Sequence, residues 1–270
     1  MSDARLIQVP WYLGREHPDL SRGPGVLAAA IGGETVVVPA PQARPVPNEV
    51  ADSFAVIRSV RSAVSDAVEE DRFPLVLAVN CFTSLGTVAG VGRDIGVIWF
   101  DAHGDFHTPD STITGFLDGM GLAMLLGDGW DELRATVEGL RPVPGENALL
   151  VSARDLDPTE ADRVAASDLR QADTETLEPA LDELATRVDT VYLHIDLDVI
   201  DPAVARANVL AVEGGPDTEQ LEEALAAVSS RFEIVAAALT AYDPSQDHEN
   251  RVPGIAARLT QVLAPQKVAR

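Results

Sequence analysis

The sequence contains one cysteine and few basic residues. A single cysteine among 270 residues cannot form a disulfide within the chain, and this usage is typical of a reducing compartment. Lysine and arginine total 20 against 43 aspartate and glutamate residues, which gives a formal net charge of -23. Because so acidic a surface repels phosphate backbones and anionic lipids, we expect no nucleic-acid partner and no membrane partner.

Long apolar runs and several catalytic motifs are also missing. No run approaches the ~20 apolar residues that span a bilayer, and residues 1–5 lack the basic-then-apolar pattern of a secretion signal. We therefore predict a cytoplasmic protein. The sequence has no G-x-S-x-G, no P-loop and no G-x-G-x-x-G after a strand, so nothing in it indicates a competing catalytic chemistry.

Apolar runs of strand length alternate with amphipathic segments along the whole chain. Hydrophobic residues make up 46% of the sequence, enough for a sizeable core. The alternation predicts an α/β fold: a single three-layer domain over 1–270, with a doubly wound, mainly parallel sheet and helices on both faces. Strands are expected at 74–79, 95–100, 147–152 and 190–196, and helices at 49–69, 132–140, 177–188 and 218–230, with Thr159 capping another through Ala166.

Acidic and metal-binding residue types stand at the ends of three predicted strands. Residues 101, 103 and 105 alternate after one apolar run, so an extended chain projects them to one side. Four carboxylates around one ion would be unusual, but two divalent ions can share them and activate a hydroxide for hydrolysis. The other interpretation of each stretch is a polar loop with capping aspartates. The candidate metal ligands are Cys81, Asp101, His103, Asp105, Asp196 and Asp198.

These motifs resemble those of the ureohydrolase superfamily, which includes arginase, agmatinase and formimidoylglutamase. D-A-H-G-D at 101–105 matches the family signature D-A-H-x-D, and H-I-D-L-D-V-I-D-P at 194–202 matches (S/H)-x-D-x-D-x-x-D-P. R-D-L-D at 154–157 is similar to an arginase segment, as are the paired glycines at 214–215. The resemblance implies an arginase-like fold, a binuclear manganese centre, a small-molecule substrate and a homo-oligomer, usually a trimer or hexamer.

One metal position departs from the family. Where its first metal motif, G-G-D-H-S, supplies a histidine ligand, this sequence has Cys81. A thiolate can bind the ion but favours zinc, iron or copper over manganese, so Zn²⁺ is an alternative cofactor. The other interpretation is a buried structural cysteine beside an incomplete site. A branch that hydrolyses N-hydroxy-arginine resembles this sequence in having cysteine here.

The substrate positions depart as well. Arginases hold the guanidinium with a glutamate at the end of the last strand, where this sequence has Ala241 beside Asp243, and with a threonine where it has Leu210. Asp118 replaces a catalytic histidine, and is either a proton shuttle or a helix cap. His107 stands where arginases have an asparagine that binds the substrate α-carboxylate. His107 either contacts the substrate in the same way or forms hydrogen bonds only within its own loop. Asp157 keeps the position that arginases direct to the α-amino group, and Asp243 is the remaining candidate for the guanidinium contact.

Three functional hypotheses follow. The first is a metal-dependent hydrolase of C–N bonds in a guanidino-, hydroxyguanidino- or amidino-type compound, with Asp105 orienting the nucleophile and Asp118 or His107 transferring a proton. The second is a catalytically degenerate binding or scaffold protein on the same fold. The third keeps catalysis but changes the substrate to an uncharged amide, with Leu210 and Ala241 lining an apolar pocket.

Overall fold

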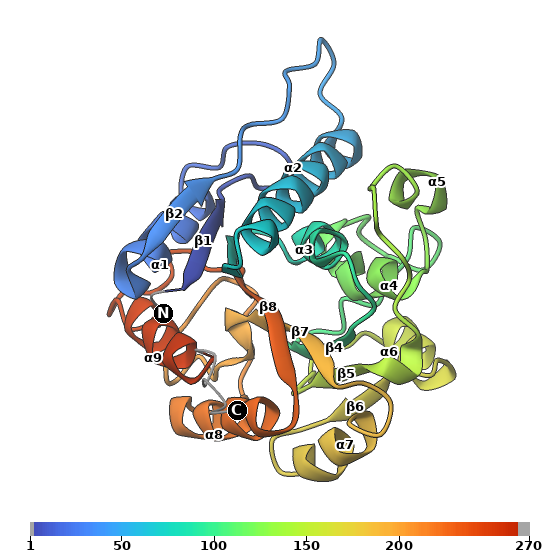
Figure 1. The fold of residues 1–270 in the computed structure, drawn as a ribbon, viewed down its shortest axis with the longest axis vertical. Coiled ribbons are helices and arrows are strands. Elements are labelled where there is room, and N and C mark those ends of the chain that lie inside the picture. The colour runs from blue at the N-terminus through green and yellow to red at the C-terminus, as the bar shows by residue number, and fades with distance from the viewer. Residues whose placement is uncertain (1–2, 264–270) are drawn as a thin grey trace.

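The computed structural model describes residues 3–263, which form one parallel β-sheet covered by helices (Figure 1). Neighbouring strands pair in the order β2-β1-β3-β8-β7-β4-β5-β6, every pair parallel. The strands are β1 (Ala4–Val9), β2 (Glu34–Val37), β3 (Phe73–Ala78), β4 (Gly96–Phe100), β5 (Ala148–Val151), β6 (Arg170–Ala172), β7 (Thr190–Asp196) and β8 (Glu233–Thr240).

Helices cover both faces of the sheet, and each face has its own apolar core (Figure 1). This arrangement confirms the predicted three-layer, doubly wound α/β fold. One face carries α1 (Gly23–Ile31), α7 (Leu177–Leu184), α8 (Thr218–Arg231) and α9 (Val252–Val262); the other carries α2 (Glu49–Glu69), α3 (Ser84–Val91), α4 (Gly121–Leu126) and α6 (Pro158–Ala166). That the domain extends over all of 1–270 stays a prediction, because 1–2 and 264–270 lie outside the described residues.

The central strands are buried on both faces, which explains their continuous apolar runs. Among them, β4 includes the fully buried ring of Trp99, and β7 includes that of Tyr192. The predicted start of α2 is also confirmed, since the Asn48 side chain accepts a hydrogen bond from the Ala51 N–H. Within residues 3–263, no helix is long and apolar enough to cross a membrane.

Two helix predictions need correction. The helix expected over 132–140 is only α5 (Asp131–Arg134), because the chain then turns and Gly139 adopts a left-handed φ of 81°. The helix expected with Thr159 as its cap begins at Pro158, and its cap is Asp157, whose side chain accepts the N–H groups of Thr159 and Glu160. The second correction concerns the functional site, since Asp157 is also a predicted substrate contact.

Candidate metal centre

The carboxyl ends of β3, β4, β7 and β8 bring the predicted ligands together at one edge of the sheet. Two groups of donor atoms form there, and within each group all the atoms lie within 4.8 Å of one another. The first group comprises Cys81, Asp101, His194 and Asp196; the second comprises Asp101, His103 and Asp198. Five of the six predicted ligands are therefore adjacent, and Asp101 belongs to both groups.

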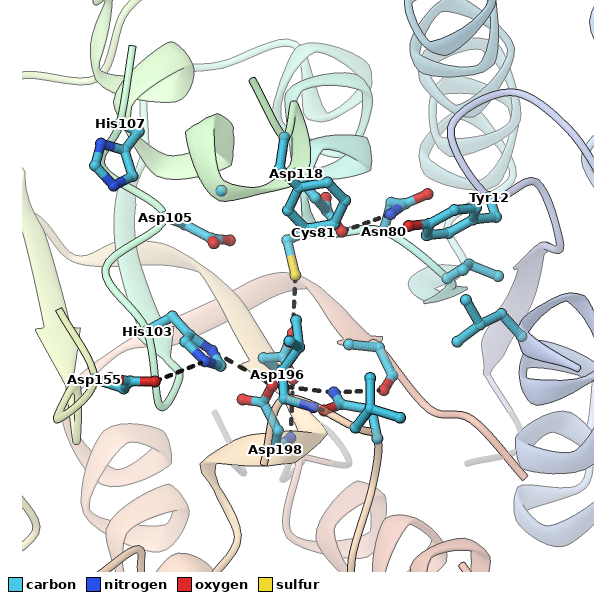
Figure 2. Close-up of a pocket in the computed structure, with 18 of the residues that line it drawn as sticks. Tyr12, Asn80, Cys81, His103, Asp105, His107, Asp118, Asp155, Asp196 and Asp198 are labelled. Carbon is cyan, nitrogen blue, oxygen red and sulfur yellow. Dashed lines mark hydrogen bonds and ion pairs between the residues drawn. The ribbon is translucent and has the colours of Figure 1, made fainter. Parts of the chain in front are cut away.

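Short contacts link the residues within each group (Figure 2). The Cys81 thiol donates to Asp196 Oδ2 at 2.9 Å, and its Sγ lies 3.3 Å from the hydroxyl of Thr240. The Nδ1 atom of His103 lies 3.3 Å from Asp101 Oδ1 and 3.4 Å from Asp198 Oδ2. These contacts place an imidazole between two carboxylates and a thiol against a third. Cys81, His103, Asp196 and Asp198 line one cavity, and Asp101 is buried behind them.

Asp105 lies beside these groups and has an unpaired buried oxygen. Its residue is 7% exposed, and within the described chain Asp105 Oδ2 has no hydrogen-bond partner. The backbone is held in a left-handed conformation, φ 47°, where the Asp105 carbonyl accepts the N–H groups of Leu122 and Ala123. A buried carboxylate oxygen without a donor is costly, so its position beside three other carboxylates fits a cation site.

The acidic groups of the centre have strongly shifted pKa values. Burial, and then the charge of neighbouring aspartates, raises the pKa of Asp105 and of Asp196 well above the usual range. Burial, and then Asp196, raises the pKa of Cys81 in the same way. Burial lowers the pKa of His103, but its hydrogen bonds to Asp101 and Asp198 outweigh that effect and raise it to about 12. In the metal-free protein these groups therefore keep protons, and a divalent cation that binds among them would displace those protons.

The cavity above these groups has a volume of about 350 Å³ and largely apolar walls. Val209 and Leu210 stand at its rim and are 65% and 52% exposed. Ala241, in the place of the arginase glutamate, also lines the cavity and has a left-handed φ of 61°. The remaining apolar lining comes from Tyr12, Leu20, Val79 and Phe116.

Asp118 lines the cavity near Cys81 and does not cap the helix that it begins. The short helix Asp118–Met120 has Leu117 at its N-cap and no side-chain cap hydrogen bond. Instead its oxygens accept from Asn80 Nδ2 at 2.5 Å and from the Phe82 N–H at 3.1 Å. Burial raises the pKa of Asp118 to about 7, against the lowering effect of these donors.

His107 and Asp157 form a pair at the side of the cavity. His107 Nε2 lies 2.9 Å from Asp157 Oδ2, and His107 Nδ1 lies 3.2 Å from the Ser111 hydroxyl. Both residues line the cavity. Asp243, in contrast, is not among the lining residues, and its carboxylate accepts the N–H of Ser245. The structure thus brings two of the three predicted substrate contacts to the cavity.

Several residues of the site were missed by sequence reasoning. His194 belongs to the first donor group, and its alternation with Asp196 along β7 was a visible signal. Asn208 donates to Asp198 Oδ2 at 3.0 Å, and Glu160 lines the cavity beneath Gly104, where an added Cβ would lie 2.7 Å from the Glu160 carboxyl carbon. Neither residue had a sequence signal, because each reaches the site through a long-range contact.

Comparison with known families agrees with this geometry. The model of the Arginase family matches residues 2–264. The chain belongs to the arginase family. It is 33% identical to an arginase from Bacillus subtilis (strain 168) over 218 residues, covering 76% of this chain and 73% of that protein. An arginase from Bacillus caldovelox is 31% identical over 220 residues, covering 77% and 73%.

Solved structures of arginase-family members have the same fold. The B. subtilis arginase structure superposes with a TM-score of 0.86 at 27% identity, covering 99% of this chain and 100% of that one. The B. caldovelox arginase structure gives a TM-score of 0.88 at 26% identity, with the same coverage. The B. subtilis formimidoylglutamase, at 18% identity and a TM-score of 0.74, shares the fold over 97% of this chain and 87% of that one. The protein is therefore an arginase-family hydrolase with a buried Asp/His/Cys cluster.

Proposed function

We propose that this protein hydrolyses a C–N bond in a small guanidino-, hydroxyguanidino- or amidino-type compound with the help of two divalent ions. The observation that carries the proposal is the pair of donor groups that share the buried Asp101 and whose other members include four cavity-lining residues, Cys81, His103, Asp196 and Asp198. Manganese is the ion proposed from the family resemblance, and zinc is the alternative because Cys81 offers a soft sulfur. The proposed ligands are Cys81, Asp101, His103, Asp105, Asp196 and Asp198.

The residues around the ions have separate tasks in this mechanism. Two bound divalent ions would lower the pKa of a water enough to make it a nucleophile at neutral pH. The unpaired Oδ2 of Asp105 accepts a hydrogen bond from that nucleophile and orients it toward the amidine carbon. Asp118, whose pKa of about 7 suits proton transfer near neutrality, passes a proton to the leaving amine as the C–N bond breaks.

His107 and Asp157 are the proposed contacts for the head of the substrate. Both residues line the cavity, and their side chains lie 2.9 Å apart. A zwitterionic head can replace this contact by placing its carboxylate against His107 and its ammonium group against Asp157. Asp243 is not among the residues that line the cavity, whereas Asp118 is, so Asp118 is the proposed carboxylate for a cationic tail. The pocket therefore differs from that of an arginase at the end that would hold the guanidinium-type tail of the substrate.

An uncharged amide is the second candidate substrate. It is favoured by the apolar walls at the tail end, where Leu210 and Ala241 line the cavity without a carboxylate of their own. Burial of a guanidinium against such groups without a partner is costly. The proposal further includes a homo-oligomer, a trimer or hexamer, acting on small molecules in the cytoplasm.

Metal analysis combined with a substrate panel tests the proposed function. We expect up to two divalent ions per chain and turnover of at least one guanidino, N-hydroxyguanidino, formimino or amide compound. Removal of the metal with a chelator should abolish turnover, and adding back Mn²⁺ or Zn²⁺ should restore it. A protein that takes up no metal and turns over no compound would instead be the degenerate scaffold.

Ala241→Glu tests the identity of the tail pocket. The new carboxylate would stand in the cavity wall and pair a cationic tail, so kcat/KM for guanidino compounds should rise at least about tenfold, a change of ~1.4 kcal/mol in transition-state stabilisation. Ala241→Gln is the matched control, because it adds the same volume without charge. An equal effect of both variants would contradict an electrostatic role at this position.

A further inference from the structure

The two donor groups of the centre are chemically unequal. The first contains a thiol, an imidazole and two carboxylates, whereas the second contains an imidazole and two carboxylates. In the first group the residues are all buried, and His194 is 0% exposed. The second includes the half-buried His103, which lines the cavity. The group deeper in the molecule therefore has the softer and more complete set of donors.

His194 is held firmly with its Nε2 atom toward the first group. Its ring stacks on Trp99 with centroids 3.5 Å apart and planes 12° apart, and Trp99 Nε1 donates to Asp101 Oδ2 at 3.0 Å. His194 Nδ1 lies 2.9 Å from the Ser84 hydroxyl and 3.1 Å from the Tyr192 hydroxyl. These oxygens can accept the Nδ1 proton, which leaves the lone pair of Nε2 free for an ion, as in most histidine ligands.

The hydroxyl of Thr240 lies between His194 and its neighbours. It is 3.2 Å from His194 Nε2, 3.3 Å from Cys81 Sγ and 3.4 Å from Asp196 Oδ2. Three donors of one group thus converge on a single small hydroxyl. An ion bound among the three would take over the contacts that the hydroxyl makes here.

We propose that His194 is a ligand of the first position, together with Cys81, Asp101 and Asp196, and that this position takes a zinc-class ion. The inference rests on the binuclear centre proposed above and deepens it. One sulfur, one nitrogen and two oxygens from four residues supply the four donors that a tetrahedral zinc ion takes, and thiolate, imidazole and carboxylate are all zinc ligands. The second position includes His103 and Asp198, which line the cavity, and so keeps the open character of a hydrolytic site. The two positions then hold different metals.

Cobalt substitution tests the ligand set without reference to turnover. Metal-free, full-length protein is titrated with one equivalent of Co²⁺ and then competed with Zn²⁺. We expect a thiolate-to-cobalt charge-transfer band that Cys81→Ser abolishes, and intense visible bands of a four-coordinate ion. His194→Ser should weaken Zn²⁺ binding by more than about 100-fold, because loss of a supporting residue alone costs about 10–100-fold. His248→Asn, at an exposed histidine outside both groups, is the control and should leave the spectrum and the affinity unchanged.

X-ray absorption on a second variant covers the case in which His194→Ser does not fold. In His103→Ala protein loaded with one equivalent of Zn²⁺, the only histidine left in the two groups is His194. We expect one sulfur at about 2.3 Å and one imidazole nitrogen at about 2.0–2.1 Å. Sulfur without imidazole would overturn the role of His194 and leave the proposed function standing. Failure of the wild-type protein to bind Co²⁺ or Zn²⁺ while it binds Mn²⁺ would overturn the inference alone, and failure to bind any of the three ions would overturn both.

Discussion

Asp118 lies at the cavity floor with both carboxylate oxygens engaged by the segment that follows β3. Asn80 and the backbone of Phe82 donate to it, which favours the ionised form, while burial favours the protonated form. The balance raises its pKa to about 7. A carboxyl group that exchanges a proton near neutrality is suited to the transfer that C–N cleavage requires.

Asp118→Asn should therefore impair catalysis more than binding. We expect kcat to fall by about 10²- to 10⁴-fold, the range of a general acid–base contribution, with a much smaller change in KM. The pH–rate profile should also lose the limb near pH 7. Steady-state kinetics over pH 5–9 on the best compound of the panel measures both effects.

Asp110→Asn is the control for this variant, because Asp110 is an exposed aspartate on the loop before Asp118. It should leave kcat and the pH profile unchanged. A profile of Asp118→Asn with its limb near pH 7 intact would show that another group transfers the proton.

At the scale of elements, Arg154 fixes the loop that follows β7. Its guanidinium donates to four backbone carbonyls, those of Ser152, Asp198, Val212 and Glu213, at 2.9–3.2 Å. Gly215 permits this close approach, since an added Cβ would lie 2.6 Å from Arg154 Nη2 and 2.3 Å from the Val199 carbonyl oxygen. The paired glycines of the sequence thus serve to hold the segment that carries Asp198.

Arg154→Lys should loosen this segment, because a single ammonium group cannot reproduce the planar set of N–H donors that the guanidinium directs to the four carbonyls. We expect a loss of about 2 kcal/mol in the free energy of unfolding, the order of one to two lost charged hydrogen bonds, and weaker metal binding through Asp198. Urea unfolding of the metal-free protein and a metal titration measure the two effects.

Arg93→Lys is the matched control. Arg93 is exposed and pairs with Glu233 at 3.3 Å, a surface ion pair that contributes little to stability. Equal stability losses in the two variants would contradict the role assigned to Arg154.

At the scale of the whole molecule, the acidic centre links stability to pH. In the folded, metal-free protein His103 keeps its proton up to a pKa of about 12, whereas an unfolded histidine loses it near its ordinary value of 6.5. Between pH 7 and 9 the folded state therefore binds more protons than the unfolded state. Stability then falls as pH rises, by up to about 1.4 kcal/mol per pH unit for this group. The raised pKa values of Asp105 and Asp196 have an effect of the same sign at pH values between the ordinary carboxyl pKa and their own.

The melting temperature of the metal-free protein should accordingly be lower at pH 9 than at pH 7. Saturation with metal should raise the melting temperature at both values, because ions replace the protons and offset the repulsion among four buried carboxylates. His103→Asn should remove most of the pH dependence, whereas His248→Asn, at an exposed residue, should preserve it. A melting temperature that is equal at pH 7 and 9 in metal-free wild-type protein would contradict this account.

Features that depend on local sequence were predictable. The bounds of β7 agree with the predicted 190–196, since its apolar run and its polar end are contiguous. Asn48 caps α2 as expected, because capping depends on residues within one turn. β6 was not predicted, since Arg170–Ala172 is a short edge strand with no apolar run and forms only by pairing with β5.

The sequence by itself determined the parallel α/β fold and the donors that gather at its carboxyl edge, because strand periodicity and residue spacing are local properties. Tertiary structure decided which of those donors lie close enough to hold one ion, because β4 and β7 are neighbours in space while about 90 residues separate them along the chain. It placed His194 in the first group beside Cys81, and it kept Asp243 out of the cavity that Asp118 lines. Contacts between distant segments set these outcomes, and no spacing in the sequence encodes them.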